Sequence, residues 1–175
     1  MNYATIKPVD IANGPGVRVS LFVSGCTHHC KGCFNAQAWD FSYGEPFTES
    51  VQEQIFSYLD HDYLEGITLL GGEPMEPENQ EGLLPFVREV KRRFPQKTIW
   101  CFTGYDFEQD ILGRMMKESA VTRELVPLFD VIVDGKFEES LRNLSLKFRG
   151  SENQRILNVK QSLIEGKAVW MEQFR

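Results

Sequence analysis

Three of the four cysteines of this chain fall within one short segment, CTHHCKGC, and no other feature limits the possible folds as strongly. Cys26, Cys30 and Cys33 form a C-x3-C-x2-C pattern directly after a short run of β-branched residues. Such tight spacing places three thiolates around one object. A 4Fe–4S cluster usually takes four thiolates, so three leave one iron open, as catalytic zinc keeps an open position. The pattern therefore predicts an iron–sulfur cluster that also binds an exchangeable group.

Structural zinc is the main alternative to a cluster. Zinc requires a closed set of four ligands, which His28 or His29 would complete. Zinc fingers usually draw two ligand pairs from separated segments, and no second pair follows here. We therefore favour the cluster and interpret both histidines as solvated loop residues. Cys101, the fourth cysteine, stands in an apolar run, which favours a small core residue.

Short apolar runs alternate with helical patterns along the chain, and they predict an α/β fold with a mostly parallel sheet. The runs expected to be strands are residues 17–25, 67–72, 98–104 and 129–135, with shorter strands at 155–159 and 168–170. Three helices are expected, and each has a signal at its N-terminus. These signals are a capping box at Ser50 and Glu53, and the N-cap residues Asn79 and Asp106.

The C-terminal ends of parallel strands meet at one edge of a sheet, where ligands bind. The cysteine loop follows the first predicted strand, and Gly71-Gly72-Glu73-Pro74 follows the second. Gly104-Tyr105 follows the third and Asp134-Gly135-Lys136 follows the fourth. We therefore expect segments that are distant in sequence to converge on one rim.

Length and charge limit the class of protein. A chain of 175 residues suits one domain, expected to span residues 1–175. A formal net charge of −6 disfavours general binding to nucleic acid or to anionic membranes. No apolar stretch is long enough to span a bilayer, and the start Met1-Asn2-Tyr3 lacks the order of a signal peptide. These features predict a cytoplasmic protein, in which clustered cysteines indicate metal binding or catalysis.

Several motifs together carry a resemblance to a known family. The cysteine pattern follows the first strand, GGEP follows the second, and Asn13-Gly14-Pro15-Gly16-Val17-Arg18 precedes the first. In these features the chain resembles the radical S-adenosylmethionine enzymes and, among them, the glycyl-radical-enzyme activases. Further segments resemble the activases of anaerobic ribonucleoside-triphosphate reductase: Pro8-Val9-Asp10-Ile11, Ser24-Gly25-Cys26, Trp100 with Thr103-Gly104-Tyr105, Val133-Asp134-Gly135-Lys136-Phe137, and Arg149-Gly150-Ser151 with Asn153-Gln154.

Two positions depart from the broader family. Many radical enzymes have an aromatic residue just before the third cysteine, where this chain has Gly32; its aromatic residue, Phe34, comes after. Asn13 stands where several other activases have aspartate, so no carboxylate role is expected at that position.

The resemblance implies a fold and a reaction. The fold would be a partial (β/α) barrel of the radical S-adenosylmethionine type. A 4Fe–4S cluster on Cys26, Cys30 and Cys33 would cleave S-adenosylmethionine reductively to methionine and a 5′-deoxyadenosyl radical. That radical would generate a glycyl radical on the large catalytic subunit of anaerobic ribonucleoside-triphosphate reductase. A reducing electron donor such as a flavodoxin would supply electrons to the cluster.

The resemblance also assigns residues to S-adenosylmethionine. Gly71, Gly72, Glu73 and Pro74 would line its methionyl end, with Glu73 positioning the amino group; an ordinary strand-end turn is the alternative. Gly32 and Phe34 would contact the adenosine, unless Phe34 is a core residue. Asp134 and Lys136 would orient the nucleoside or the partner, or form a surface ion pair. Residues 149–155 would dock the partner or form a solvated loop.

Three other functions remain open at this point. The chain would activate another glycyl radical enzyme, or it would be an iron–sulfur electron-transfer or sensing protein without catalysis. The latter needs a fourth cluster ligand in place of an open iron. A zinc-stabilised binding module is the third, although neither rival explains the GGEP loop or the NGPGVR turn.

Overall fold

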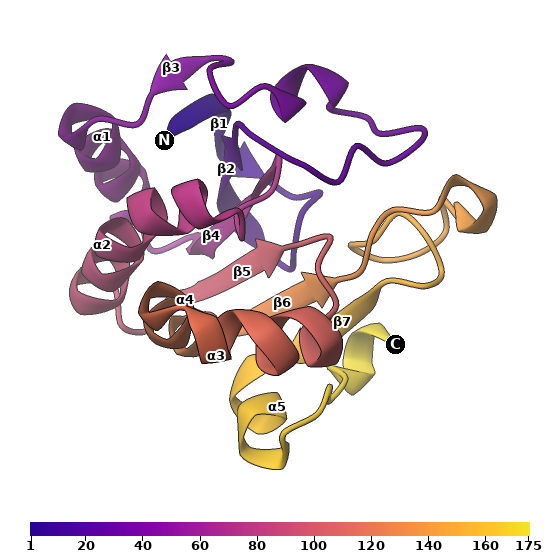
Figure 1. Ribbon diagram of the computed structural model, residues 1–175. Helices are drawn as coiled ribbons and strands as arrows, with labels where there is room; N and C mark the ends of the chain where they lie inside the picture. The colour runs from indigo at the N-terminus through magenta and orange to yellow at the C-terminus, as the bar shows by residue number, and fades with distance from the viewer.

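The computed structural model describes residues 1–175, and its strands are β1 (Asn2–Asp10), β2 (Val17–Val23), β3 (Glu45–Pro46), β4 (Leu64–Gly71), β5 (Thr98–Phe102), β6 (Val131–Asp134) and β7 (Arg155–Asn158). They form one sheet in the order β3-β1-β2-β4-β5-β6-β7 (Figure 1). The four central strands β2, β4, β5 and β6 run parallel. The outer strands β1, β3 and β7 pair antiparallel with their neighbours.

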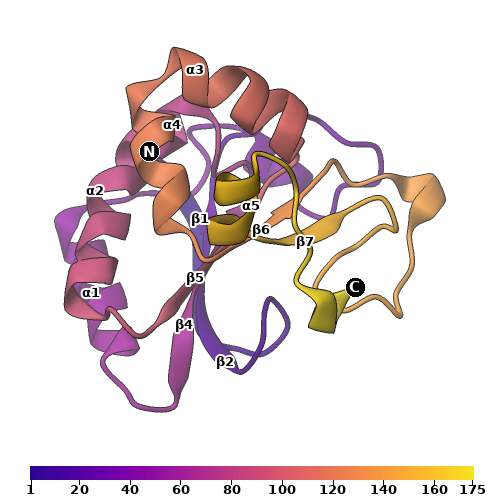
Figure 2. The ribbon, with the colours of Figure 1, turned by 90° about the horizontal axis from the view of Figure 1, so that it is seen from below.

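The helices cover mainly one face of this sheet. They are α1 (Glu49–Leu59), α2 (Pro77–Arg93), α3 (Met116–Glu118), α4 (Ala120–Leu125) and α5 (Val159–Glu165), together with the π-helical segment η2 (Phe107–Met115). Figure 2 shows α1, α2 and α4 on one side of the sheet, with the C-terminus and the segment after β6 on the other. A core of 26 buried apolar residues joins the strands to these helices. No helix combines the length and apolar character that a membrane crossing requires.

The α/β class and the parallel pairing of the central strands are confirmed. The assignment to a partial barrel of the radical S-adenosylmethionine type stays a prediction. The strand expected at 155–159 is β7, whereas 168–170 makes only an isolated bridge between Trp170 and Leu157, so that expectation is wrong. The strands β1 and β3 were not expected.

Two of the three expected helix starts are wrong. Helix α1 begins at Glu49, and its cap is Thr48, whose hydroxyl accepts from the Val51 N–H at 3.3 Å. Ser50 lies inside the helix and therefore cannot cap it. Asp106 does cap η2, because its carboxylate accepts from the backbone N–H of Gln109 at 2.7 Å.

Asn79 lies in the first turn of α2 rather than at its cap, because the helix already begins at Pro77. Its side-chain amide is buried and donates to the backbone carbonyls of Ser24 and Glu73, at 2.9 Å each. Asn79 therefore connects α2 to the loops that follow β2 and β4.

The NGPGVR turn closes the end of the sheet opposite the cysteine loop. Arg18 is 1% exposed, and its guanidinium donates to the Thr68 hydroxyl at 2.9 Å and the Thr98 carbonyl at 2.9 Å. Burial lowers the pKa of Arg18 to about 10. A Cβ on Gly14 would lie 2.7 Å from Cδ of Arg18, so the turn needs glycine there. The hydrogen bonds of Arg18 therefore join β2, β4 and β5.

Candidate functional site

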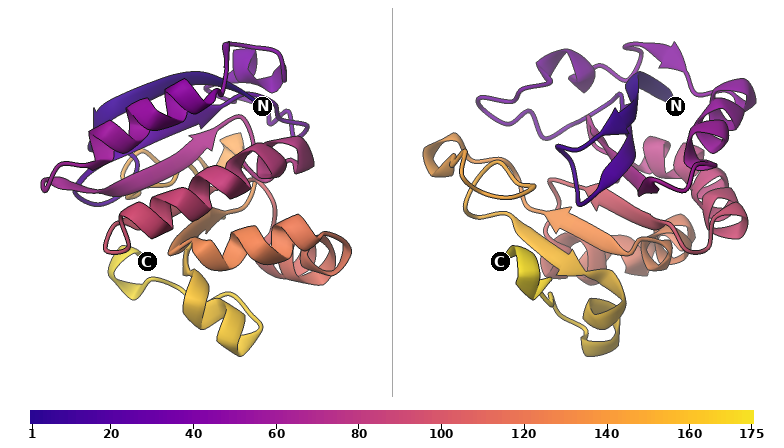
Figure 3. Two further views of the ribbon diagram at one scale, coloured as in Figure 1. Left: turned by 90° about the vertical axis from the view of Figure 1, so that its left-hand side faces the viewer. Right: turned by 180° about the vertical axis from the view of Figure 1, so that it is seen from behind.

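A cavity of about 230 Å³ opens at the C-terminal ends of the parallel strands. Figure 3 shows the loop after β2 and the segment after β6 approaching each other at this end of the molecule. The expected convergence of the loops is confirmed. The predicted site residues that line the cavity are Cys26, Cys30, Cys33, Phe34, Gly71, Gly72 and Glu73. Gly32, Pro74, Asp134 and Lys136 do not line it.

Backbone N–H groups point at the sulfur atoms of the cysteines. The N–H groups of His28 and His29 donate to Cys26, and that of Asn35 lies 3.4 Å from Sγ of Cys33. Burial nevertheless raises the pKa of Cys26 to about 11. A thiolate here consequently needs a metal as partner, since metal coordination deprotonates thiols.

Cys30 receives its hydrogen bond from a different part of the chain. The backbone N–H of Phe137, after β6, donates to its sulfur, and the charge of Lys136 acts in the same direction. Burial outweighs both and raises the pKa of Cys30. Hydrogen bonds to sulfur and nearby charge are the means by which proteins tune iron–sulfur clusters. The three thiols with their N–H donors therefore suit a cluster.

Cys101 lies elsewhere, as its apolar surroundings predict. It is fully buried in the core beneath the helices and does not line the cavity. The cavity thus brings together three of the four thiols of the chain.

The interpretation of the histidines as solvated is wrong for His28. Its side chain is 7% exposed, and Nε2 lies 2.8 Å from Oε2 of Glu73. His29 is exposed, as expected, and stacks on the Trp39 ring with the centroids 4.3 Å apart. The contact between His28 and Glu73 has no sequence signal, because it depends on how two loops meet.

Glu73 is 1% exposed and its carboxylate is fully engaged within the chain. Besides His28, Oε2 accepts from the N–H of Gly104 at 2.7 Å, and Oε1 accepts from the N–H of Met75 at 2.8 Å. The acidic side chain of the GGEP motif therefore holds the loops after β2, β4 and β5 together.

Steric crowding explains why the GGEP loop has glycines at these positions. A Cβ on Gly72 would lie 2.6 Å from the carbonyl oxygen of Gly25 and 2.9 Å from that of Ala38. Gly71 has φ +104°, which side chains rarely adopt. Pro74, which follows, is buried. The loop consequently lies against the backbone on both sides of the cysteine segment.

Glu76 also supports the cysteine loop, although no sequence pattern indicates this role. It is 4% exposed, and its Oε1 accepts from the backbone N–H of Thr27 at 2.8 Å and from the Thr27 hydroxyl at 2.6 Å. An acidic residue just before a helix is too common a feature to reveal this contact from sequence.

Gly32 and Phe34 flank Cys33 on the outer side of the loop. Gly32 has φ +78° and faces Glu139. Phe34 is 65% exposed, so the alternative of a core residue is wrong. The centroid of its ring lies 5.6 Å from the centroid of the Phe137 ring. Phe34 therefore leaves an aromatic surface at the edge of the cavity.

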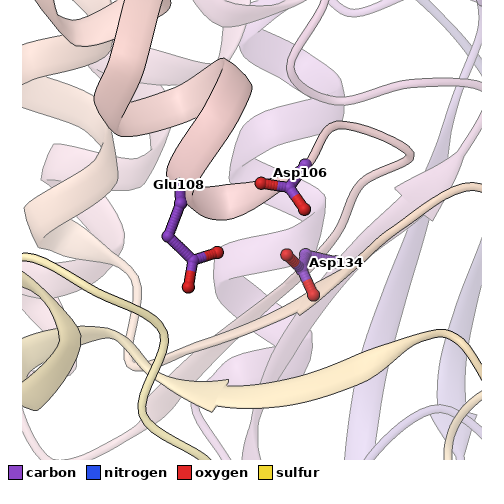
Figure 4. Close-up of side chains that lie close together, drawn as sticks. All are labelled: Asp106, Glu108 and Asp134. Carbon is purple, nitrogen blue, oxygen red and sulfur yellow. The ribbon is translucent and has the colours of Figure 1, made fainter.

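Asp134 and Lys136 do not pair with each other. Asp134 is 1% exposed and its carboxylate bonds Arg155, so the surface ion pair considered for these residues is wrong. Figure 4 shows its carboxylate beside those of Asp106 and Glu108. Lys136 is exposed.

Residues 149–155 support the rim from behind. The amide of Gln154 donates to the Gly135 carbonyl at 3.0 Å, and that of Asn153 donates to the Lys136 carbonyl at 2.8 Å. These internal contacts give the segment a structural role, and the docking of a partner by residues 149–155 stays a prediction.

An open cavity lined by cysteines at the ends of parallel strands is typical of an iron–sulfur protein. The profile of the 4Fe-4S single cluster domain matches residues 12–157, so the chain has this domain. Three relatives, each an anaerobic ribonucleoside-triphosphate reductase-activating protein, cover nearly the whole chain.

The relative from Pasteurella multocida is 44% identical over 92% of this chain and 99% of its own length. The relative from Enterobacteria phage T4 is 44% identical over 89% of this chain and 93% of its own. The relative from Escherichia coli K12 is 42% identical over 88% and 96%. The chain belongs to the family of anaerobic ribonucleoside-triphosphate reductase-activating proteins, and the resemblance noted in the sequence is confirmed.

Proposed function

We propose that this chain activates an anaerobic ribonucleoside-triphosphate reductase by generating a glycyl radical on its large catalytic subunit. Cys26, Cys30 and Cys33 hold the 4Fe–4S cluster, and S-adenosylmethionine binds beside it in the cavity. When bound and reduced by one electron, these groups would supply methionine and a 5′-deoxyadenosyl radical, which would take a hydrogen atom from a glycine Cα to leave 5′-deoxyadenosine and a glycyl radical. An external one-electron donor such as a flavodoxin reduces the cluster.

One observation carries the proposal: three thiols and the GGEP loop line the same cavity. The loop after β4 lines the cavity together with the thiols, which supports a ligand site next to the cluster; a closed electron-transfer site would not need one. The remaining thiol, Cys101, is buried in the core and gives no fourth ligand there. This arrangement favours an open iron over the ferredoxin-like alternative.

The residues of the chain bind, orient and exclude water in this proposal. Leu70, Phe102 and Val133 form an apolar part of the cavity wall, which would help exclude water. Thr103 adds a polar group to that wall and would orient the methionyl or ribose end. Phe34, at the open edge, would cover the adenine by stacking.

The carboxylate of Glu73 takes a supporting role here. Because its oxygens already accept from His28, Gly104 and Met75, we assign it to fixing the loop. The expected contact with the methionyl amino group then falls to the backbone of the loop.

The test is 5′-deoxyadenosine formation. The protein is reconstituted anaerobically with iron and sulfide, reduced with dithionite and given S-adenosylmethionine, with and without the reductase subunit. We expect 5′-deoxyadenosine from the native chain, none from Cys33→Ala, and a glycyl electron paramagnetic resonance (EPR) signal when the subunit is present. An intact cluster that yields no 5′-deoxyadenosine with the subunit present would refute the proposal.

A further inference from the structure

His28 contacts loops from three separate parts of the chain. Its Nε2 lies 2.8 Å from Oε2 of Glu73, which also accepts from the N–H of Gly104 at 2.7 Å. The ring lies edge-on to that of Tyr105, with centroids 4.5 Å apart at 68°. One side chain of the cysteine loop therefore contacts the loops after β4 and β5.

Hydrogen-bond chemistry identifies the donor in this contact. A carboxylate oxygen only accepts, so Nε2 of His28 carries the hydrogen. The two side chains are 7% and 1% exposed, and hydrogen bonds to buried carboxylates are among the stronger ones. Loss of the histidine donor would leave the carboxylate of Glu73 short of a partner away from water.

The packing around the ring leaves it little freedom. A Cβ on Gly104 would lie 2.7 Å from Cδ2 and 2.8 Å from Nε2 of His28, so the third loop touches the ring directly. His28 itself lines the cavity, between the ligands Cys26 and Cys30. Any shift of the ring would therefore move part of the cavity wall.

We propose that His28 is a positioning residue: by donating to Glu73 it fixes residues 71–76 against the cysteine loop and so sets where S-adenosylmethionine meets the cluster. This inference rests on the proposed function, because it requires S-adenosylmethionine to bind in the cavity. It assigns no proton transfer to His28. The residue acts through Glu73 and the backbone that Glu73 holds.

Three variants of the full, anaerobically reconstituted chain test the inference. His28→Leu removes the donor and retains bulk, whereas His28→Gln retains an N–H donor on a side chain of similar reach. Lys31→Gln is the matched control in the same loop, since the Lys31 side chain is 92% exposed and glutamine keeps most of its length.

Each protein is measured in three ways. Iron content reports cluster assembly. Hydrogen–deuterium exchange of residues 71–76 reports whether the loop is fixed. Titration of the EPR signal of the reduced cluster with S-adenosylmethionine gives its dissociation constant.

We expect His28→Leu to keep its iron, to exchange faster at residues 71–76, and to bind S-adenosylmethionine at least about tenfold more weakly, which corresponds to about 1.4 kcal/mol. His28→Gln should stay within about threefold of the native dissociation constant, about 0.7 kcal/mol. Lys31→Gln should match the native chain in all three measurements.

Native exchange and native affinity in His28→Leu would overturn the inference, as would equal losses in the leucine and glutamine variants. If His28→Leu does not assemble a cluster, the glutamine variant decides: near-native affinity supports the inference and a tenfold loss rejects it. A native protein whose EPR signal ignores S-adenosylmethionine would instead reject the proposed function. The exchange data, which need no S-adenosylmethionine, would then decide whether His28 fixes the loop.

Discussion

Arg155 donates two hydrogen bonds to the carboxylate of Asp134, from Nε at 3.0 Å and from Nη2 at 2.6 Å. Asp134 is 1% exposed and also accepts from the N–H of Phe107 at 2.8 Å. Burial raises the pKa of Asp134, and these donors oppose that rise. Because Arg155 also reaches Glu108 at 2.8 Å, one guanidinium joins β6, β7 and η2 behind the rim of the cavity.

Replacing Arg155 with leucine should destabilise the chain strongly. The change leaves the buried carboxylate of Asp134 unpaired, and breaking a buried ion pair in this way costs about 3–5 kcal/mol. The free energy of unfolding is measured anaerobically by denaturant titration. The control is Arg92→Leu, which breaks an exposed pair with Glu89 and should change little. Similar losses in the two variants would contradict the prediction.

Asp10 should make the stability depend on acid pH. Its carboxylate accepts from the Ser20 hydroxyl at 2.6 Å, the Ala12 N–H at 2.9 Å and the Asn13 amide at 2.7 Å. Burial raises the pKa of Asp10, but these hydrogen bonds outweigh it and hold the pKa below the ordinary 3.8. Folding therefore favours the ionised form, and that contribution is present above the unfolded pKa and lost as pH falls through the folded pKa.

The comparison of native chain and Asp10→Asn isolates this contribution. The free energy of unfolding of the native chain should fall more steeply below about pH 4 than that of the variant, because the variant has no such proton to bind. Denaturant titrations at several pH values give both curves. Parallel curves would show that Asp10 does not contribute.

The sequence predicts the parallel strands because they are buried on both faces, and such strands are continuous apolar runs. β5 and β6 meet that description, whereas β2 and β4 also carry Arg18, Ser20 and Glu65 among their apolar residues. β1 does not meet it, since it is exposed along much of its length and contains Lys7 and Pro8, which are typical of an edge strand. β3 has only two residues, too few for any periodic pattern.

Some residues of the site can likewise be recognised from local sequence, whereas others depend on tertiary contacts. Cys26, Cys30 and Cys33 are recognisable because their spacing within one loop is itself the signal. His28 and Glu73 are 45 positions apart, and nothing in either local sequence shows that they meet. The same holds for Arg155, whose partners lie in β6 and η2, so the carboxylate of Asp134 was expected at the cavity although it serves the framework behind it.

Adding one methyl group at Gly72 should disturb the site. The new Cβ of Gly72→Ala would stand 2.6 Å from the Gly25 carbonyl oxygen, so the GGEP loop must move away from the cysteine segment. Overpacking of this kind costs about 1–3 kcal/mol, and we expect lower iron content as well. The control Gly166→Asn lies at the end of α5, where a Cβ meets nothing and asparagine tolerates the φ of +68°. Native stability and iron content in Gly72→Ala would refute the steric argument.

Cys101 should be dispensable for the cluster. Cys101→Ala removes one buried heavy atom from the core and should lower the free energy of unfolding by roughly 1 kcal/mol. Its iron content and visible spectrum should match those of the native chain, whereas Cys33→Ala should lose the cluster. Iron and sulfide analysis after anaerobic reconstitution distinguishes the two. Cluster loss in Cys101→Ala would place this thiol among the ligands.

Replacing Arg18 with lysine should destabilise the chain, although lysine keeps the positive charge. The guanidinium donates to four acceptors in a fixed fork: the hydroxyls of Thr68 and Thr98, and the carbonyls of Ile67 and Thr98. An ammonium group offers three donors from a single point and cannot span both strands. Because hydrogen bonds to charged groups contribute about 1.5–3 kcal/mol each, we expect Arg18→Lys to lose about 2–4 kcal/mol.

The position of Arg18 makes this prediction specific. It lies at the start of β2, at the opposite end of the strand from the cysteine loop, so the folded variant should still assemble its cluster. Denaturant titration and iron analysis on the same preparations separate the two effects, with Arg92→Lys as an exposed control that should change neither, because lysine can also pair with Glu89. A variant that keeps its stability but loses its iron would show that the NGPGVR turn acts on the site rather than on the sheet.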